Sequence, residues 1–277
     1  MRQTKTYKEF TAKVAWPSRV REVVRRGAIR IASIGSNMRY SSGGIRFPFY
    51  HHVFDDERSG FERQIALFKN VGEFITINQA IELLEGNSSI NGNYFCLSFD
   101  DGLKSCFENV CPILDLYNVP AIFYIIPDYI GKSLAPENLI SETIFNFKGS
   151  STSLDFLTWK DCKEMVSLGM LFGSHTSSHL NLALTNENTV YKEMLISKTL
   201  IEKKLGACEH FCPPYGIPSL HYDPIRDVRV AKQIGFRSFV SGVRGPNVLG
   251  DSVFSLCRDH VLANWENYQL HYFFSRN

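Results

Sequence analysis

The stretch "YFCLSFDDG", residues 94–102, changes its character after the sixth residue. Five of its first six residues are apolar or aromatic, which is typical of a buried strand, and two adjacent aspartates and a glycine follow directly. Neighbouring carboxylates repel each other, so a bound cation or a shared proton is expected to hold them together. A helix N-cap would need only one of them. The pattern therefore predicts a ligand site at the end of this strand.

From Phe47 onward, short apolar runs alternate with longer amphipathic ones. The runs predicted as strands are 72–77, 94–99, 121–126, 169–173 and 236–242. The segments predicted as helices are 61–70, 104–117, 158–168, 187–205 and 225–234. Strands that are each followed by a helix imply a parallel sheet covered by helices, which is either an α/β barrel or a doubly wound sheet. Residues 127–155 interrupt this order, and we expect either an insertion over the active-site face or a plain surface loop.

The basic residues are concentrated at the start of the chain. Residues 1–46 contain eleven Lys and Arg against two Glu, a net charge of +9, which leaves 19 basic against 26 acidic residues, or −7, for the remainder. We therefore divide the chain into a basic N-terminal extension, 1–46, and a catalytic barrel, 47–277. Within the extension, residues 16–34 mix valines and isoleucines with five arginines. This pattern fits a basic amphipathic helix on an anionic membrane, and equally a helix docked on the barrel with a solvated basic face.

The cysteine pattern and the N-terminus favour a cytoplasmic protein. The seven cysteines are an odd number without a CxxC pair, which is typical of reduced thiols. No charged start followed by an apolar run marks a secretory signal, and no stretch approaches the ~20 apolar residues of a membrane helix. We expect a cytoplasmic location, with the inner membrane face as an alternative.

A second group of polar residues follows the predicted strand 169–173. In "GSHTSSHLNL", His175 and His179 are four residues apart, which would place both imidazoles on one side of a helical turn, suitable for chelating a metal ion. Two imidazoles and one carboxylate leave coordination positions open, as in hydrolytic metal sites. The remaining aspartate is then available as a general base.

The motifs "SFDDG", "SHTSSH" and "FCPPYG", in this order, resemble those of the polysaccharide deacetylase family, the NodB-homology group of carbohydrate esterases. The resemblance implies a distorted (β/α) barrel of about seven strands. It implies Asp100 as the catalytic base and Asp101, His175 and His179 as metal ligands. In the family, water activated by the ion attacks an N-acetyl carbonyl, and the backbone NH of Tyr215 is the expected oxyanion donor. Zinc is the expected metal, although cobalt, nickel or iron accept the same ligands.

Two features depart from the family pattern. Many members have an arginine in the third motif that orients the base, where this chain has Cys212. Arg258, in "SLCRDHV", is our candidate for that role, against the alternative of a surface salt bridge. The family also uses a histidine near the end of the domain as general acid. Here His260 is the best match, with Asp259 as a possible partner, although adjacent side chains on a strand point to opposite faces. His271 is a weaker choice.

The stretch "FPFYHHVFDDER", 47–58, is similar to the start of the barrel in related deacetylases, so we expect His51 or His52 at the floor of the site, His51 being our choice for the substrate contact. Asp55 and Asp56 are expected to be loop or cap residues.

The resulting hypothesis is a metal-dependent hydrolase that removes an N-acetyl group from a sugar of a surface polysaccharide such as O-antigen, or from its nucleotide- or lipid-linked precursor. A glycan, and not a nucleic acid, is the expected partner. The alternatives are an O-acetyl or other acyl sugar hydrolase, formyl included, and a degenerate barrel that only binds glycans.

Overall fold

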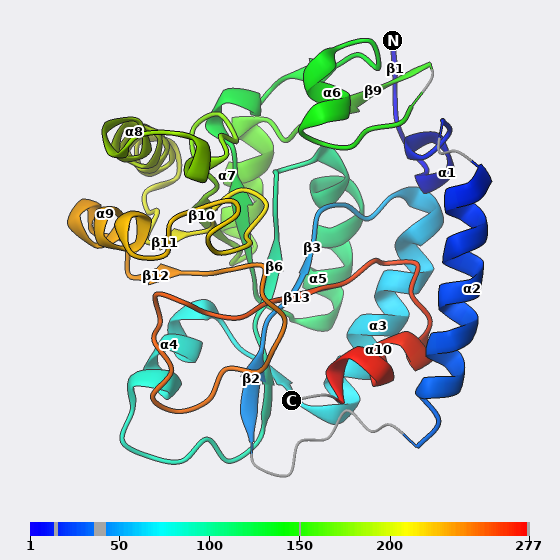
Figure 1. Cartoon of the computed structure of the whole chain (residues 1–277), viewed down its shortest axis with the longest axis horizontal. Coiled ribbons are helices and arrows are strands. Elements are labelled where there is room, and N and C mark those ends of the chain that lie inside the picture. Colours follow the sequence, from blue (N-terminus) through cyan, green and yellow to red (C-terminus); the bar gives the residue numbers. More distant parts are fainter. Residues whose placement is uncertain (14–15, 36–42, 150, 276–277) are drawn as a thin grey trace.

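The computed structural model describes residues 1–13, 16–35, 43–149 and 151–275. Its centre is a parallel sheet of seven strands that curls into an incomplete barrel (Figure 1), in the order β12-β11-β10-β7-β6-β3-β13. The strand bounds are β3 Pro48–Tyr50, β6 Leu97–Phe99, β7 Ala121–Ile125, β10 Leu171–Ser174, β11 His210–Phe211, β12 Ser238–Phe239 and β13 Asp259–His260. The distorted (β/α) barrel of about seven strands is therefore confirmed.

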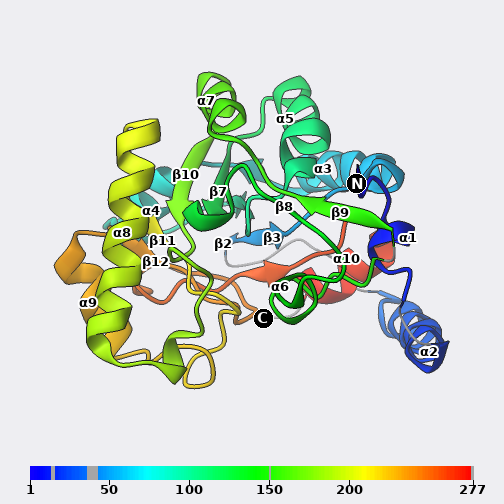
Figure 2. The ribbon, with the colours of Figure 1, turned by 90° about the horizontal axis from the view of Figure 1, so that it is seen from above.

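The main helices cover the outside of this sheet, as the view from above shows (Figure 2). Their bounds are α3 Arg58–Val71, α4 Ile77–Glu85, α5 Cys111–Tyr117, α7 Trp159–Ser167, α8 Glu187–Leu205, α9 Arg226–Ile234 and α10 Asn267–Phe274. Shorter turns lie at η1 Asp55–Glu57, η3 Pro127–Tyr129 and η4 Leu182–Leu184, and a π-helix, η2, at Cys106–Val110. The five predicted helices are all present, but 104–117 is divided between η2 and α5.

The predicted strand 94–99 is also divided, because the sheet bends at its middle. Its first half, β5 (Asn93–Phe95), joins a small parallel sheet between β2 (Gly44–Arg46) and β4 (Glu73–Phe74). Its second half is β6, in the barrel. Cys96, at the bend, donates its backbone NH to the carbonyl of Arg46 over 2.9 Å, which keeps the two halves in line.

The beginning of the chain and the insertion 127–155 form one structure over the carboxyl edge of the barrel strands. β1 (Arg2–Gln3) pairs in parallel with β9 (Thr152–Asp155), which pairs with β8 (Ser133–Leu134). α1 (Tyr7–Phe10) and α6 (Leu139–Thr143) lie nearby, at the top of Figure 1. The ring of Phe10 packs against those of Phe54 and Phe147 at 5.4 and 5.5 Å. Of the two expectations for this region, the insertion over the active-site face is the one observed.

The predicted division of the chain at residue 46 stays a prediction, but both ends of the extension contact the barrel domain. Arg46 is buried and forms an ion pair of 2.7 Å with Asp259. α2 (Trp16–Ala32) lies on the outside of the molecule beside α10 (Figure 1). No helix in the described ranges is long and apolar enough to cross a membrane.

The turn after β6 depends on Gly102. Asp101 and Gly102 both have positive φ, 71° and 78°, so the chain reverses within two residues. A Cβ at Gly102 would lie 3.0 Å from Cγ2 of Ile125. Glycine therefore satisfies a backbone requirement and a packing requirement at this position.

We predict that Gly102→Ala lowers the free energy of unfolding by about 2–3 kcal/mol, because strain at positive φ is combined with crowding against Ile125. Gly169→Ala is the matched control, since Gly169 has a φ of +84° and a Cβ added there would meet no atom within 4 Å. There the loss should be about 1 kcal/mol. Urea denaturation measures both, and equal losses would contradict the role of the contact.

Candidate metal and active site

The side chains singled out by the sequence meet in one cavity of about 970 Å³ at the carboxyl ends of the barrel strands. Asp100 and Asp101 come directly after β6, and the two histidines of the second motif follow β10. The insertion and α1 supply the outer wall, through residues such as Phe10, Phe145 and Lys148. The predicted residues that line the cavity are His51, His52, Asp100, Asp101, His175, His179, Tyr215, Arg258 and His260.

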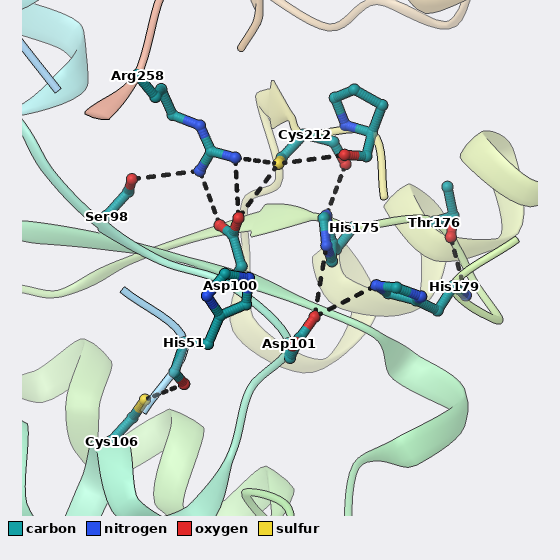
Figure 3. Close-up of polar contacts among 11 residues, drawn as sticks. His51, Ser98, Asp100, Asp101, Cys106, His175, Thr176, His179, Cys212 and Arg258 are labelled. Carbon is teal, nitrogen blue, oxygen red and sulfur yellow. Dashed lines mark hydrogen bonds and ion pairs between the residues drawn. The ribbon is translucent and has the colours of Figure 1, made fainter. Parts of the chain in front are cut away.

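Asp101, His175 and His179 are buried and face one another (Figure 3). Oδ1 of Asp101 lies 3.5 Å from Nε2 of His175 and 3.4 Å from Nε2 of His179. One ligand atom from each residue lies within 4.8 Å of the other two. Oδ1 of Asp101 accepts no hydrogen bond in the part of the chain that the structure describes. A buried carboxylate oxygen without a partner, beside two imidazole nitrogens, fits a divalent metal ion.

The protonation states of His175 and Asp101 are those that a metal ion requires of its ligands. Burial lowers the pKa of His175 to about 4, so its imidazole is neutral and keeps a lone pair. Nδ1 of His175 lies 2.8 Å from the carbonyl oxygen of Cys212, which we assign as an N–H donor contact, leaving Nε2 free as a ligand. Burial would raise the pKa of Asp101, but the neighbouring histidines outweigh it and hold the carboxylate ionised.

The predicted helical turn that carries the two histidines is wrong. Residues 175–181 form an irregular loop, in which Thr176 and His179 have positive φ of 63° and 65°. The loop is fixed by Glu193 of α8, which the sequence analysis missed because a single glutamate on a long polar helix gives no signal. Its Oε2 accepts hydrogen bonds from the backbone NH groups of Ser177 and Ser178, over 3.0 and 2.9 Å. Tertiary contacts thus bring the histidines together, not helical periodicity.

Asp100 points away from Asp101 and is paired with Arg258 (Figure 3). The guanidinium donates to both carboxylate oxygens over 2.8 Å, and all of these groups are buried. Burial alone would raise the pKa of Asp100, but the charge and hydrogen bonds of Arg258 hold it below its ordinary value. The same guanidinium lies 2.9 Å from Sγ of Cys212. Arg258 thus contacts both Asp100 and the residue that stands in place of the motif arginine, and a surface salt bridge is excluded.

His260 lies in the cavity beside His51, with their rings 5.1 Å apart. Burial, and then the proximity of His51, lower the pKa of His260 to about 3, so its imidazole is neutral. The expected partnership with Asp259 is wrong, because Asp259 points to the other face of the strand and accepts two hydrogen bonds of 2.7 Å from Arg46. His271, on α10, is not among the residues that line the cavity.

Of the remaining predicted residues, Tyr215 and His52 line the cavity, whereas Asp55 and Asp56 do not appear among its lining residues. The ring of Tyr215 lies 4.8 Å from that of His179, and its φ is 62°. His52 also lines the cavity, but its Nδ1 is held 3.0 Å from Glu57. Asp55 and Asp56 are structural, as expected, and their Oδ1 atoms accept hydrogen bonds from Asn109 Nδ2 and Tyr7 N.

Comparison with known proteins agrees with this geometry. Residues 88–239, more than half of the chain, match the polysaccharide deacetylase family model. The chain belongs to the polysaccharide deacetylase family. It is 28% identical over 156 residues to poly-beta-1,6-N-acetyl-D-glucosamine N-deacetylase of Staphylococcus aureus, a match that covers 56% of this chain and 47% of that protein. The chain thus spans about half the length of these curated relatives.

Solved structures of family members have the same fold. IcaB from Ammonifex degensii superimposes with a TM-score of 0.69 at 21% identity, covering 84% of this chain and 98% of that one. The Streptococcus pyogenes deacetylase PplD superimposes with a TM-score of 0.67, also at 21% identity, covering 84% and 99%. At this identity, the likeness establishes the fold of the deacetylase barrel and not the substrate.

We predict that Asp101→Ala, His175→Ala and His179→Ala each remove a bound divalent metal, because each deletes one of three ligands. Elemental analysis after loading with zinc measures the loss. Asp100→Asn is the matched control, since Asp100 is paired with Arg258, and it should retain the metal. Parental metal content in the three alanine variants would contradict the site.

We predict that Glu193→Ala weakens metal affinity about 10–100-fold, because the histidine loop loses its anchor. Glu193→Gln should lose less, since one amide oxygen can still accept both backbone hydrogen bonds and only the hydroxyl of Ser178 loses its carboxylate acceptor. Glu202→Gln is the control on the same helix, where the carboxylate pairs with Lys198 and not with the histidine loop. A competition titration with a chelator measures affinity, and an unchanged Kd in Glu193→Ala would count against this role.

Proposed function

We propose that this protein is a metal-dependent N-deacetylase that removes an acetyl group from an N-acetylated sugar of a polysaccharide or of its lipid- or nucleotide-linked precursor. The observation that carries the proposal is the arrangement of the two adjacent carboxylates. The side chain of Asp101 faces two imidazoles, and its Oδ1 has no hydrogen-bond partner among the residues that the structure describes, whereas Asp100 is held by Arg258. One aspartate is thus available to a metal ion, and the other to a proton.

In this proposal Asp101, His175 and His179 hold the ion, with zinc as the expected metal and cobalt, nickel or iron as substitutes. When bound, such an ion polarises the acyl carbonyl and lowers the pKa of a water molecule beside it. Asp100 is the general base, because it is ionised and adjacent to the ligand Asp101. Arg258 acts as a positioning residue, since its two hydrogen bonds fix the orientation of the Asp100 carboxylate.

The leaving amine needs a proton as the C–N bond breaks. The low pKa of His260 argues against a resident imidazolium, so we propose that His260 relays the proton that Asp100 takes from water. The backbone NH of Tyr215 would donate to the oxyanion. This NH makes no hydrogen bond with the residues that the structure describes, so it is available as a donor. His51, facing His260, would contact the sugar.

The size and composition of the cavity support a glycan substrate. At about 970 Å³ it is at the upper end of the ~300–1,000 Å³ range of ligand pockets, larger than one sugar requires. Its wall combines aromatic residues with charged ones, such as Lys13, Glu142 and Lys148. The relatives named poly-beta-1,6-N-acetyl-D-glucosamine N-deacetylases support a polymer of N-acetylated sugars as the substrate class.

The basic N-terminal segment favours, in addition, peripheral contact with an anionic membrane, which would bring the cavity near a lipid-linked glycan. A role in surface polysaccharide synthesis and a cytoplasmic location remain parts of this proposal.

One observation favours a second candidate, hydrolysis of an O-acetyl or another acyl group. Esters need less help from a general acid, and a neutral His260 is a poor resident acid. The non-catalytic glycan-binding alternative, in contrast, loses its main support, because Arg258 supplies the guanidinium that the third motif lacks.

We predict that the zinc-loaded protein lowers the mass of N-acetylated glucosamine oligomers by that of an acetyl group less a hydrogen, and releases acetate. Mass spectrometry measures the products, and matched O-acetylated oligomers separate amide from ester hydrolysis. Asp100→Asn should lower kcat by at least about 100-fold, because the general base is lost. Acetate release equal to that of the parent in Asp100→Asn would refute the assignment of the base.

A further inference from the structure

Helix α2 has an apolar stripe that faces away from the protein. Val24, Gly27, Ala28 and Ile31 occupy positions i, i+3, i+4 and i+7, so they share one helix face. All four are exposed, Val24 by 67% and Ile31 by 73%. Ile29, on the opposite face, is only 8% exposed, and α2 contacts α10. We call the four exposed residues the outward stripe.

Arginines flank the outward stripe on both sides. At 100° per residue, Arg21 and Arg25 lie on one flank and Arg30 on the other, and all three are exposed. Within the described ranges, none of the three forms an ion pair. The 17 residues of α2 contain five arginines and one glutamate. The helix therefore combines outward apolar side chains with a strongly positive surface.

This combination fits an anionic lipid surface. An amphipathic helix of a globular protein normally turns its apolar stripe toward the core, whereas here Ile29 is buried and the stripe is turned to solvent. A second copy of the chain, docked stripe to stripe, would bring flanking arginines of both copies close together, where they repel. Lipid headgroups of negative charge instead pair with the flanking arginines, while Val24 and Ile31 enter the boundary between headgroups and acyl chains.

We infer that α2 docks in the plane of an anionic membrane through the outward stripe and its flanking arginines. The inference rests on the peripheral contact proposed above and names the surface that makes it, and it is independent of the catalytic proposal. α2 stands at the edge of the molecule (Figure 2), and Phe10 and Lys13, shortly before it in the chain, line the active-site cavity. Docking through α2 would therefore hold the cavity close to the membrane surface.

The test is co-sedimentation of the full chain with phosphatidylcholine vesicles, with and without phosphatidylglycerol. We expect the parent protein to bind only the anionic vesicles, and added salt to release it. Val24→Ser combined with Ile31→Ser should weaken binding at least about tenfold. Arg21→Gln combined with Arg25→Gln should weaken it by a similar factor and reduce its salt dependence.

The matched control is Leu184→Ser combined with Ile225→Ser, which removes two side chains that are each 82% exposed outside α2. This variant should bind like the parent. Binding of the stripe variant equal to that of the parent, or absence of the parent from anionic vesicles, would overturn the inference. So would a concentration-dependent dimer in sedimentation velocity that the stripe variant abolishes, because a second copy would then cover the stripe.

The same samples separate this inference from the proposed function. Deacetylation of a soluble oligomer should be equal in the parent and in the stripe variant, since the outward stripe lies outside the cavity. If the stripe variant loses vesicle binding but releases acetate like the parent, the outward stripe is a docking surface without a role in catalysis. Vesicle binding without any acetate release would refute the catalytic proposal and leave the docking surface in place.

Discussion

A buried carboxylate is stable only beside a compensating positive charge, and this chain buries two on adjacent residues. Asp100 is compensated within the chain by Arg258, in a bidentate contact of the kind whose disruption costs about 3–5 kcal/mol. Asp101 instead faces the imidazoles of His175 and His179. The positive φ of Asp101 directs the two side chains apart, so each carboxylate meets a different partner. The demand of Asp101 for a cation is the physical basis of the proposed chemistry.

The supporting residues come from distant parts of the chain. The histidine loop is held by Glu193, and His175 is oriented by the carbonyl of Cys212. Cys212 also contacts the guanidinium of Arg258, so the third motif supports both the metal ligands and the base. The thiol of Cys212 is smaller than an arginine side chain, so the guanidinium of Arg258, the residue just before β13, fits beside it. In the proposed site, Arg258 thus takes the role of the third-motif arginine, which orients the base, from another part of the sheet.

The N-terminal segment contacts two parts of the molecule, the insertion and α10. Its first residues join the insertion through β1 and β9 and complete the wall of the cavity, and α2 then lies along α10 with the outward stripe and its flanking arginines exposed. The first part of a segment with a net charge of +9 thereby contributes to the wall of the cavity, through residues such as Phe10 and Lys13. The proposed recognition of a glycan and the proposed approach to an anionic surface would thus be connected through the same stretch of chain.

Hydrophobic periodicity by itself predicted a parallel sheet covered by helices, because apolar patterning follows from burial. The order of three motifs, through their resemblance to a known family, narrowed this to a barrel and named several of the side chains that line the cavity, since parallel strands end at a common edge. The sequence did not determine the irregular loop that carries His175 and His179, the anchoring by Glu193, or the pairing of Asp259 with Arg46. Each of these either joins residues that are distant along the chain or differs from what local spacing predicts, such as a helical turn between His175 and His179. Only the tertiary structure could decide them, because the direction of a buried charged side chain is set by the counter-charge that packing places beside it.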